Sequence, residues 1–155
     1  MKALTSIVVV LIFIIDVQQL VGQKNRLNSS QENIKQNQER QAEKINSIFH
    51  NIEIGLATNN IELLSKHISK QLRISLRGSE TGYFSENQAM NIIESYFNNR
   101  RIIDFNFANI KSSDEGPYAT GEGHWNTRGK QEKFLVYVII AERDNRWVIT
   151  QLKIY

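Results

Sequence analysis

Apolar side chains recur at helical spacing from residue 45 onward. They stand at i, i+3, i+4, i+7 and i+11, at Ile45, Ile48, Phe49, Ile52 and Leu56. This spacing places all of them on one stripe of an α-helix. After a break at Thr58-Asn59, the side chain of Asn60 can cap a short second helix that buries Leu63, Leu64 and Ile68. The pattern therefore predicts two consecutive helices at the start of a domain.

The hydrophobic period then changes from helical to alternating and back again. Leu72, Ile74 and Leu76 alternate with polar residues up to Gly78, which is typical of a strand with one face in water. Ser85-x-x-Gln88 has the spacing of a capping box. The apolar stripe that follows consists of Ala89, Ile92, Ile93, Tyr96 and Phe97. It predicts a third helix.

Four segments rich in β-branched and aromatic residues complete the chain. They cover residues 102–110, 118–126, 133–142 and 146–154. The separators, at 114–117, 127–129 and 143–145, have turn chemistry and are short enough for antiparallel hairpins. The predicted fold class is α+β, with three N-terminal helices, one strand between the second and third, and a curved antiparallel sheet that wraps around the helices.

This order of elements resembles the cone-shaped fold of the nuclear transport factor 2-like superfamily. The chain also contains the motifs Phe49-x-x-Ile52-x-x-Gly55, Tyr83-Phe84-Ser85-x-x-Gln88-Ala89, Tyr118-Ala119-x-Gly121 and Ile149-Thr150-Gln151-Leu152-x-Ile154. Through these motifs, residues 47–155 are similar, more closely, to an exported bacteroidete family known only as a domain of unknown function. The resemblance implies the cone fold and brings no known active site.

The N-terminal segment has the pattern of an export signal. Lys2 precedes an apolar run over residues 3–15, which is shorter than the roughly 20 residues that a membrane-spanning helix needs. We expect a signal peptide at 1–22 that is cleaved before Gln23; an uncleaved anchor is the alternative. Residues 23–46 are predicted to be a polar spacer, either disordered or a solvated helix. After cleavage we expect no stable membrane insertion.

Charge and cysteine content narrow the functional classes. The net charge is +3, but residues 47–155 hold 13 basic and 12 acidic side chains, so the basic pI of about 9.2 does not predict nucleic-acid binding by the domain. The chain has no cysteine and therefore no disulfide or catalytic thiolate. An exported domain without disulfides suits a bacterial periplasm or cell surface.

His124 is the most tempting candidate for chemistry. On the strand at 118–126 it shares a face with Tyr118 and Glu122, and a Glu-x-His pair could act as an acid/base couple. The alternative is an ordinary exposed polar face, with Trp125 and small residues facing the other way. His50 and His67 show no metal-ligand spacing to His124, so neither a metal nor another cofactor is predicted.

We therefore expect a non-enzymatic exported binding module. Its cone pocket would hold a small apolar or amphipathic molecule, or serve as a surface for a protein partner. The predicted ligand-binding residues are Tyr96, Tyr118, Glu122 and His124. The alternative is a hydrolase, dehydratase or isomerase that uses His124 with Glu122 or Tyr118. The position of His124 separates the two, since an enzyme needs it inside the pocket.

The strand at 133–142 is apolar on both faces. Phe134, Val136, Val138 and Ile140 cover one face and Leu135, Tyr137, Ile139 and Ala141 the other. Because three helices cover only one side of a sheet, the second side predicts an isologous homodimer through the open face. Cover by sheet curvature, Tyr155 and long side chains is the alternative.

Overall fold

The computed structural model describes residues 31–155, which divide into two compact units between Glu43 and Lys44. The predicted signal peptide and the first part of the spacer lie outside the described residues. Residues 31–57 are helical. The part before residue 44 is exposed throughout and carries an i,i+4 ion pair between Lys35 and Glu39 at 4.0 Å. Among the described residues, no helix is both long and apolar enough to cross a membrane.

The second unit continues with two helices and six strands. In chain order they are α2 (Glu62–Ser65), β1 (Ile68–Leu76), β2 (Thr81–Ser85), α3 (Glu86–Asn98), β3 (Arg101–Ser113), β4 (Gly116–Thr127), β5 (Lys130–Arg143) and β6 (Arg146–Ile154). The strands form one sheet in the order β2-β1-β6-β5-β4-β3. The predicted α+β class and the four-strand meander are confirmed.

Two features of the sheet differ from the sequence-based expectation. β2 was not predicted; it pairs antiparallel with β1, so that Tyr83 lies opposite Arg73. The sheet is also not purely antiparallel, because β1 and β6 run parallel. Ile68, expected at the end of the second helix, begins β1 instead. The chain reaches this parallel pairing because α3 and the meander lie between the two strands and form the crossover.

The local signals around α3 explain its boundaries. Gln88 Oε1 accepts a hydrogen bond from the backbone N–H of Ser85 at 3.1 Å and another from its hydroxyl at 2.9 Å, which closes the predicted capping box. The face that α3 turns to the sheet consists of Ala89, Ile93, Tyr96 and Phe97, all buried. The helix ends at Asn98, before the extended segment of β3.

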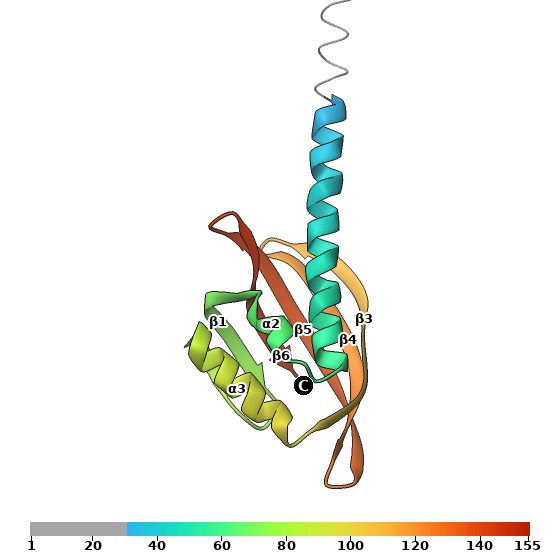
Figure 1. Ribbon diagram of the computed structural model, residues 1–155, viewed down its shortest axis with the longest axis vertical. Coiled ribbons are helices and arrows are strands. Elements are labelled where there is room, and N and C mark those ends of the chain that lie inside the picture. Colours follow the sequence, from blue (N-terminus) through green and yellow to red (C-terminus); the bar gives the residue numbers. More distant parts are fainter. Residues whose placement is uncertain (1–30) are drawn as a thin grey trace, which may run out of the picture. The chain divides into compact units, whose positions relative to one another are not determined.

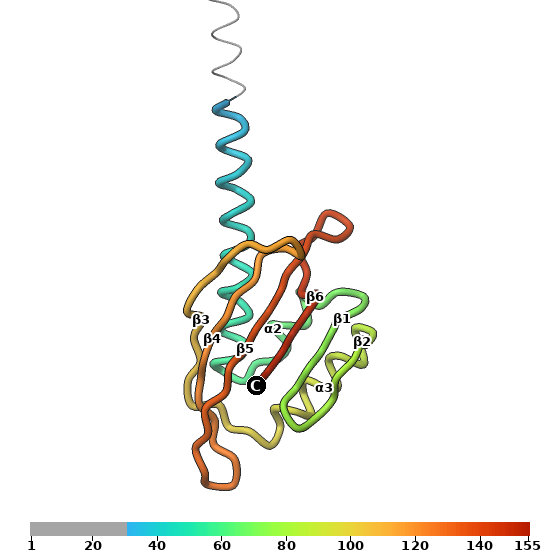
Figure 2. Tube along the Cα trace, turned by 180° about the vertical axis from the view of Figure 1, so that it is seen from behind, coloured from blue at the N-terminus to red at the C-terminus, as the bar shows by residue number. Residues whose placement is uncertain are grey.

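The core lies between the helices and one face of the sheet, which we call the inner face. Figure 1 and Figure 2, seen from opposite sides, show α2 and α3 on the same side of the strands. Residues 44–57 contribute Phe49, Ile52 and Leu56, each at most 1% exposed. The opposite face of the sheet, which we call the outer face, carries no helix of this unit. A site on the outer face is therefore built mainly from strands and turns.

Candidate functional site

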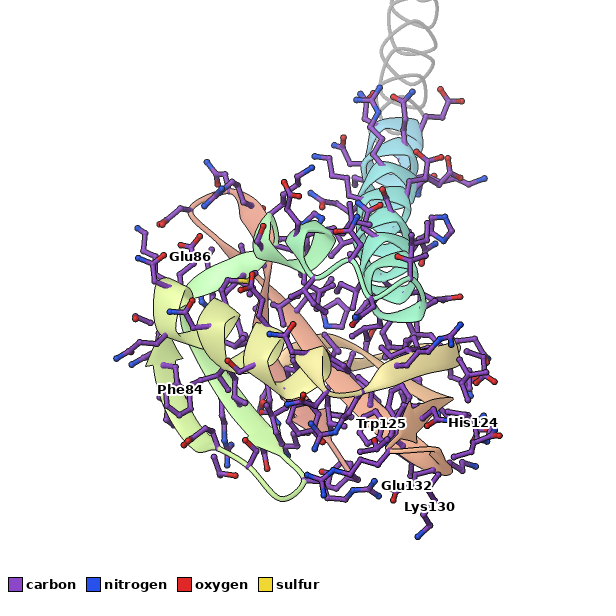
Figure 3. All side chains as sticks on the ribbon, turned by 60° about the horizontal axis from the view of Figure 1, so that its bottom comes forward. Phe84, Glu86, His124, Trp125, Lys130 and Glu132 are labelled. Carbon is purple, nitrogen blue, oxygen red and sulfur yellow. The ribbon has the colours of Figure 1, made fainter. Side chains whose placement is uncertain are left out.

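Three of the four predicted ligand-binding residues lie on the outer face. Along β4, burial alternates so that Ala119 and Trp125 point inward while Tyr118, Glu122 and His124 point outward. Figure 3 shows Trp125 below α3 and His124 directed away from it. His124 and Glu122 do not form a couple, because each has another partner. The ordinary polar face, weighed above as the alternative, describes this arrangement.

The partners of these residues are structural. His124 Nδ1 lies 2.9 Å from Asp104 Oδ1, and the backbone N–H of His124 donates to the same oxygen at 3.1 Å. Because β3 carries an irregularity between Ile102 and Asp104, this double contact fixes the register beside it. Glu122 pairs with Lys133 at 2.6 Å. These contacts give the polar groups of His124 and Glu122 partners within the protein itself.

Tyr96 lies on the other side of the sheet from these three residues. It is 4% exposed, and its hydroxyl donates to the carbonyl of Arg77 at 3.3 Å. Burial raises the pKa of Tyr96, although the positive charges of Arg100 and Arg77 act in the opposite direction. The predicted set of four residues therefore does not line a common pocket.

Aromatic side chains fill the space where the cone pocket was expected. Trp125 stacks on Phe134 at 4.3 Å between ring centroids, and Phe134 stacks on Phe105 at 5.8 Å. Phe107 extends the row at 5.1 Å from Phe105. The indole N–H of Trp125 has no hydrogen-bond acceptor among the described residues, which costs about 1–3 kcal/mol. Burying an indole of about 200 Å² contributes about 5 kcal/mol, which exceeds the cost of the missing hydrogen bond.

A hollow of about 430 Å³ opens on the outer face, where β1 and β6 separate, and a smaller one of about 370 Å³, lined in part by Tyr96, lies beside α3. Register explains the hollow on the outer face. Ile68 pairs with Ile149 and Arg73 pairs with Gln151. Between these two pairs β1 advances by five residues while β6 advances by only two. At the same place β6 skips Thr150 against β5, because Ile139 pairs with Gln151 and Ile140 with Ile149. The irregularities of both pairings fall at the same place, where they interrupt the ladder between β1 and β6. β-bulges are over-represented next to functional sites for this reason.

The lining of the hollow combines an apolar floor with a charged rim. Ile68 and Val148 form the floor at 4% and 3% exposure, and the ring of Tyr83 stands at the side, 65% exposed. Ser69, Gln71 and Thr150 add hydroxyl and amide groups. The charged groups of the rim are Lys70, Glu86, Arg143, Asp144 and Arg146. An apolar body with one polar end fits such a lining.

The remainder of the outer face is mixed in character. Tyr118 and Tyr137 pack at 5.3 Å, and the ammonium of Lys153 lies 5.4 Å from the Tyr137 ring. Leu135 and Tyr155 are 46% and 54% exposed and exchange both backbone hydrogen bonds. Among the described residues, no group of three or more His, Cys, Asp or Glu could hold a metal ion.

A curved six-stranded sheet around residues 44–57 and α3 defines a protein of the nuclear transport factor 2-like fold. The chain belongs to the family described as a domain of unknown function (DUF4783), whose model matches residues 49–155. Both findings confirm the resemblance seen in the sequence.

Solved structures agree with this assignment. A DUF4783 family protein from Bacteroides uniformis is 18% identical, with 68% of this chain and 93% of that chain covered and a TM-score of 0.56. An NTF-2 like protein of unknown function from Shewanella oneidensis is 13% identical, with 73% of this chain and 97% of that chain covered and a TM-score of 0.52. A putative isomerase from Bacillus subtilis is 12% identical, with 73% of this chain and 86% of that chain covered and a TM-score of 0.58. At these identities the likeness shows the fold alone, and the search of curated proteins finds no match.

Sequence reasoning missed the residues of the hollow. Arg143-Asp144-Asn145 was interpreted only as a turn, and Tyr83 only as part of a family motif. The one signal in the sequence was the pair of arginines that flank the turn, Arg143 and Arg146, because two like charges beside a two-residue hairpin are unfavourable neighbours.

Proposed function

We propose that this protein is an exported, non-enzymatic binding module whose ligand site is the hollow on the outer face, between β1, β6 and the β5–β6 turn. The observation that carries the proposal is that aromatic rings fill the space around Trp125, while the coincident irregularities of β1 and β6 open about 430 Å³ on the outer face, more than the about 370 Å³ of the hollow beside α3. This volume falls within the range of small-molecule sites.

The placement of His124 favours binding over catalysis. An acid/base enzyme needs its proton donor and acceptor to converge on a reacting atom. Here His124 faces outward beside Asp104, Glu122 is paired with Lys133, and Tyr118 packs against Tyr137. The groups that the enzyme hypothesis requires share one face of the sheet, but each contacts another side chain instead of converging on a common point.

Native mass spectrometry of the protein purified gently from its host tests both parts of the proposal. We expect a polypeptide that begins at Gln23, together with a small mass that is lost on denaturation. A full-length mass in the membrane fraction would contradict export. To locate the ligand, Gln71→Trp fills the hollow from an exposed lining position, and Ser75→Trp is the matched control on the same face of β1. Loss of the extra mass in both variants, or in neither, contradicts the site.

We also propose that two copies pair through the outer face, centred on β5. Leu135 and Tyr155 expose apolar surface there. A two-fold axis along β5 brings β6 of one copy over β4 of the other, so that Lys153 of each copy approaches the ion pair of Glu122 and Lys133 on its partner. Sedimentation at high micromolar concentration should show a dimer that Tyr137→Lys dissociates and Thr81→Lys, at the sheet edge, does not. A wild-type monomer excludes the dimer.

A further inference from the structure

We infer that the hollow on the outer face selects an organic monoanion, a carboxylate attached to a small apolar body. This inference rests on the proposed function and specifies its ligand. It starts from the charges of the rim, which comprise the cations of Lys70, Arg143 and Arg146 and the carboxylates of Glu86 and Asp144. Figure 3 shows Glu86 at the first turn of α3. The rim therefore holds one positive charge in excess.

One cation and one carboxylate of the rim neutralise each other. Lys70 Nζ lies 3.0 Å from Asp144 Oδ2, and this contact lowers the pKa of the Asp144 carboxyl. The pair joins the irregular part of β1 to the β5–β6 turn. The charges that remain are those of the two guanidinium groups of Arg143 and Arg146 and of the Glu86 carboxylate. A ligand with a single negative charge balances this remainder.

The two arginines are placed as a pair. Arg143 and Arg146 are direct partners across β5 and β6, so their side chains stand on the same face, on either side of the turn Asp144-Asn145. Both turn residues have φ above +50°, the backbone of a tight type I′ hairpin. Like charges directly opposite each other destabilise a hairpin. Within residues 31–155 no carboxylate lies within 4.0 Å of either guanidinium; the charge of Arg146 also lowers the pKa of Asp144 from farther away, so the fold relieves this repulsion only in part.

A carboxylate is the anion that this geometry favours. Each guanidinium offers a planar fork of N–H donors that matches the two oxygens of a carboxylate. Arg143 already uses one donor, at 3.0 Å from the carbonyl of Glu142, which holds the start of the fork at the rim. Two forks at one rim can share one carboxylate group.

The apolar body of the ligand has its own surface. Val148 follows Arg146 on the same face of β6, and Ile68 closes the floor. The ring of Tyr83 is 65% exposed beside them and presents a flat wall. A phenyl or short alkyl group fits between this ring and the floor, with its charged end at the arginines. Glu86 at the rim disfavours a second negative charge, which makes the preference one for monoanions.

Three probes of nearly equal shape separate charge from shape: hydrocinnamate, hydrocinnamyl alcohol and hydrocinnamylamine. Each is titrated into the mature, full-length exported protein and followed by NMR amide chemical shifts. We expect shifts at residues 68–71, 83 and 143–150, with hydrocinnamate binding about tenfold more tightly than the alcohol, since a hydrogen bond to a charged group is worth about that factor. The double variant R143Q/R146Q should abolish this preference, and Arg101→Gln, which removes an exposed arginine on β3, should keep it.

The outcomes distinguish this inference from the proposed function. Equal binding of acid and alcohol at the hollow overturns the carboxylate inference and leaves the binding module standing. The inference also fails if Arg101→Gln lowers the affinity as much as the double variant, because the effect is then one of overall charge. If no probe shifts these amides, the inference is wrong, and the ligand recovered by native mass spectrometry decides the proposed function separately.

Discussion

Replacing Gly123 with alanine should destabilise the domain by about 3 kcal/mol. Gly123 faces inward on β4, between β3 and β5, and a Cβ built there would lie 2.3 Å from the carbonyl oxygen of Asp104 and 2.8 Å from Phe134 Cζ. The first atom belongs to the backbone of β3. The second belongs to a ring held between Trp125 and Phe105. Neither atom can turn aside without moving a strand or the row of rings.

The magnitude follows from these contacts. Overpacking a filled core costs about 1–3 kcal/mol, and a contact with fixed backbone belongs at the upper end of that range. For a domain of this size, about 3 kcal/mol lowers the melting temperature by roughly 12 °C. Thermal unfolding followed by circular dichroism, with urea denaturation as a second measure, determines the change.

Gly82→Ala is the matched control for this experiment. Its added Cβ would meet only the ring of Phe84, on the short edge strand β2, at 3.3 Å. We expect a change of at most about 0.5 kcal/mol, because a ring at the sheet edge can shift and alanine loses less backbone entropy than glycine. If Gly123→Ala unfolds at the same temperature as Gly82→Ala, the space beside Gly123 is not filled by the Asp104 carbonyl and the Phe134 ring.

Three further side chains carry predictions. Burial, then the charge of Lys66, lowers the pKa of His67 from 6.5, so the neutral imidazole is favoured in the fold and the free energy of unfolding should fall as the pH drops below 6.5. Urea denaturation at two pH values measures this, and His67→Gln should remove that part of the dependence. His124→Ala should leave hydrocinnamate binding unchanged and stability within about 1 kcal/mol, since the contact of its ring with Asp104 is partly exposed; a loss of binding would place the ligand elsewhere. Ser85→Ala should lower stability by about 1 kcal/mol through loss of the capping box, with Gln88→Ala giving a similar, non-additive loss in thermal unfolding.

Local signals were enough to predict most of the elements. The capping box fixed the start of α3, and the turns Arg128-Gly129 and Asp144-Asn145 separate the strands of the meander where their residue types indicated. These features depend on neighbours in sequence. β2 was missed because its five residues, with Tyr83 exposed, bury too little to show a pattern.

The parallel pairing and the hollow depend instead on register between distant segments. Nothing in the sequence of residues 68–73 shows that β1 advances by five residues there while β6 advances by two. The alternation in β4 predicted correctly that Tyr118, Glu122 and His124 share a face, but not which face would be inside. That choice was made by Trp125 and Phe134, whose rings bury more apolar area than the opposite side offers.

The place of β6 in the sheet has a consequence for the order of folding. β6 is the last strand of the domain in sequence and a central strand in space, and it is the strand through which β1 and β2 join β3, β4 and β5. The two halves of the sheet therefore cannot close until β6 has been made. Contacts between segments so distant in sequence slow folding. If the chain is exported as proposed, this delay keeps the domain unfolded during transit, because the sheet can close only once β6 is available.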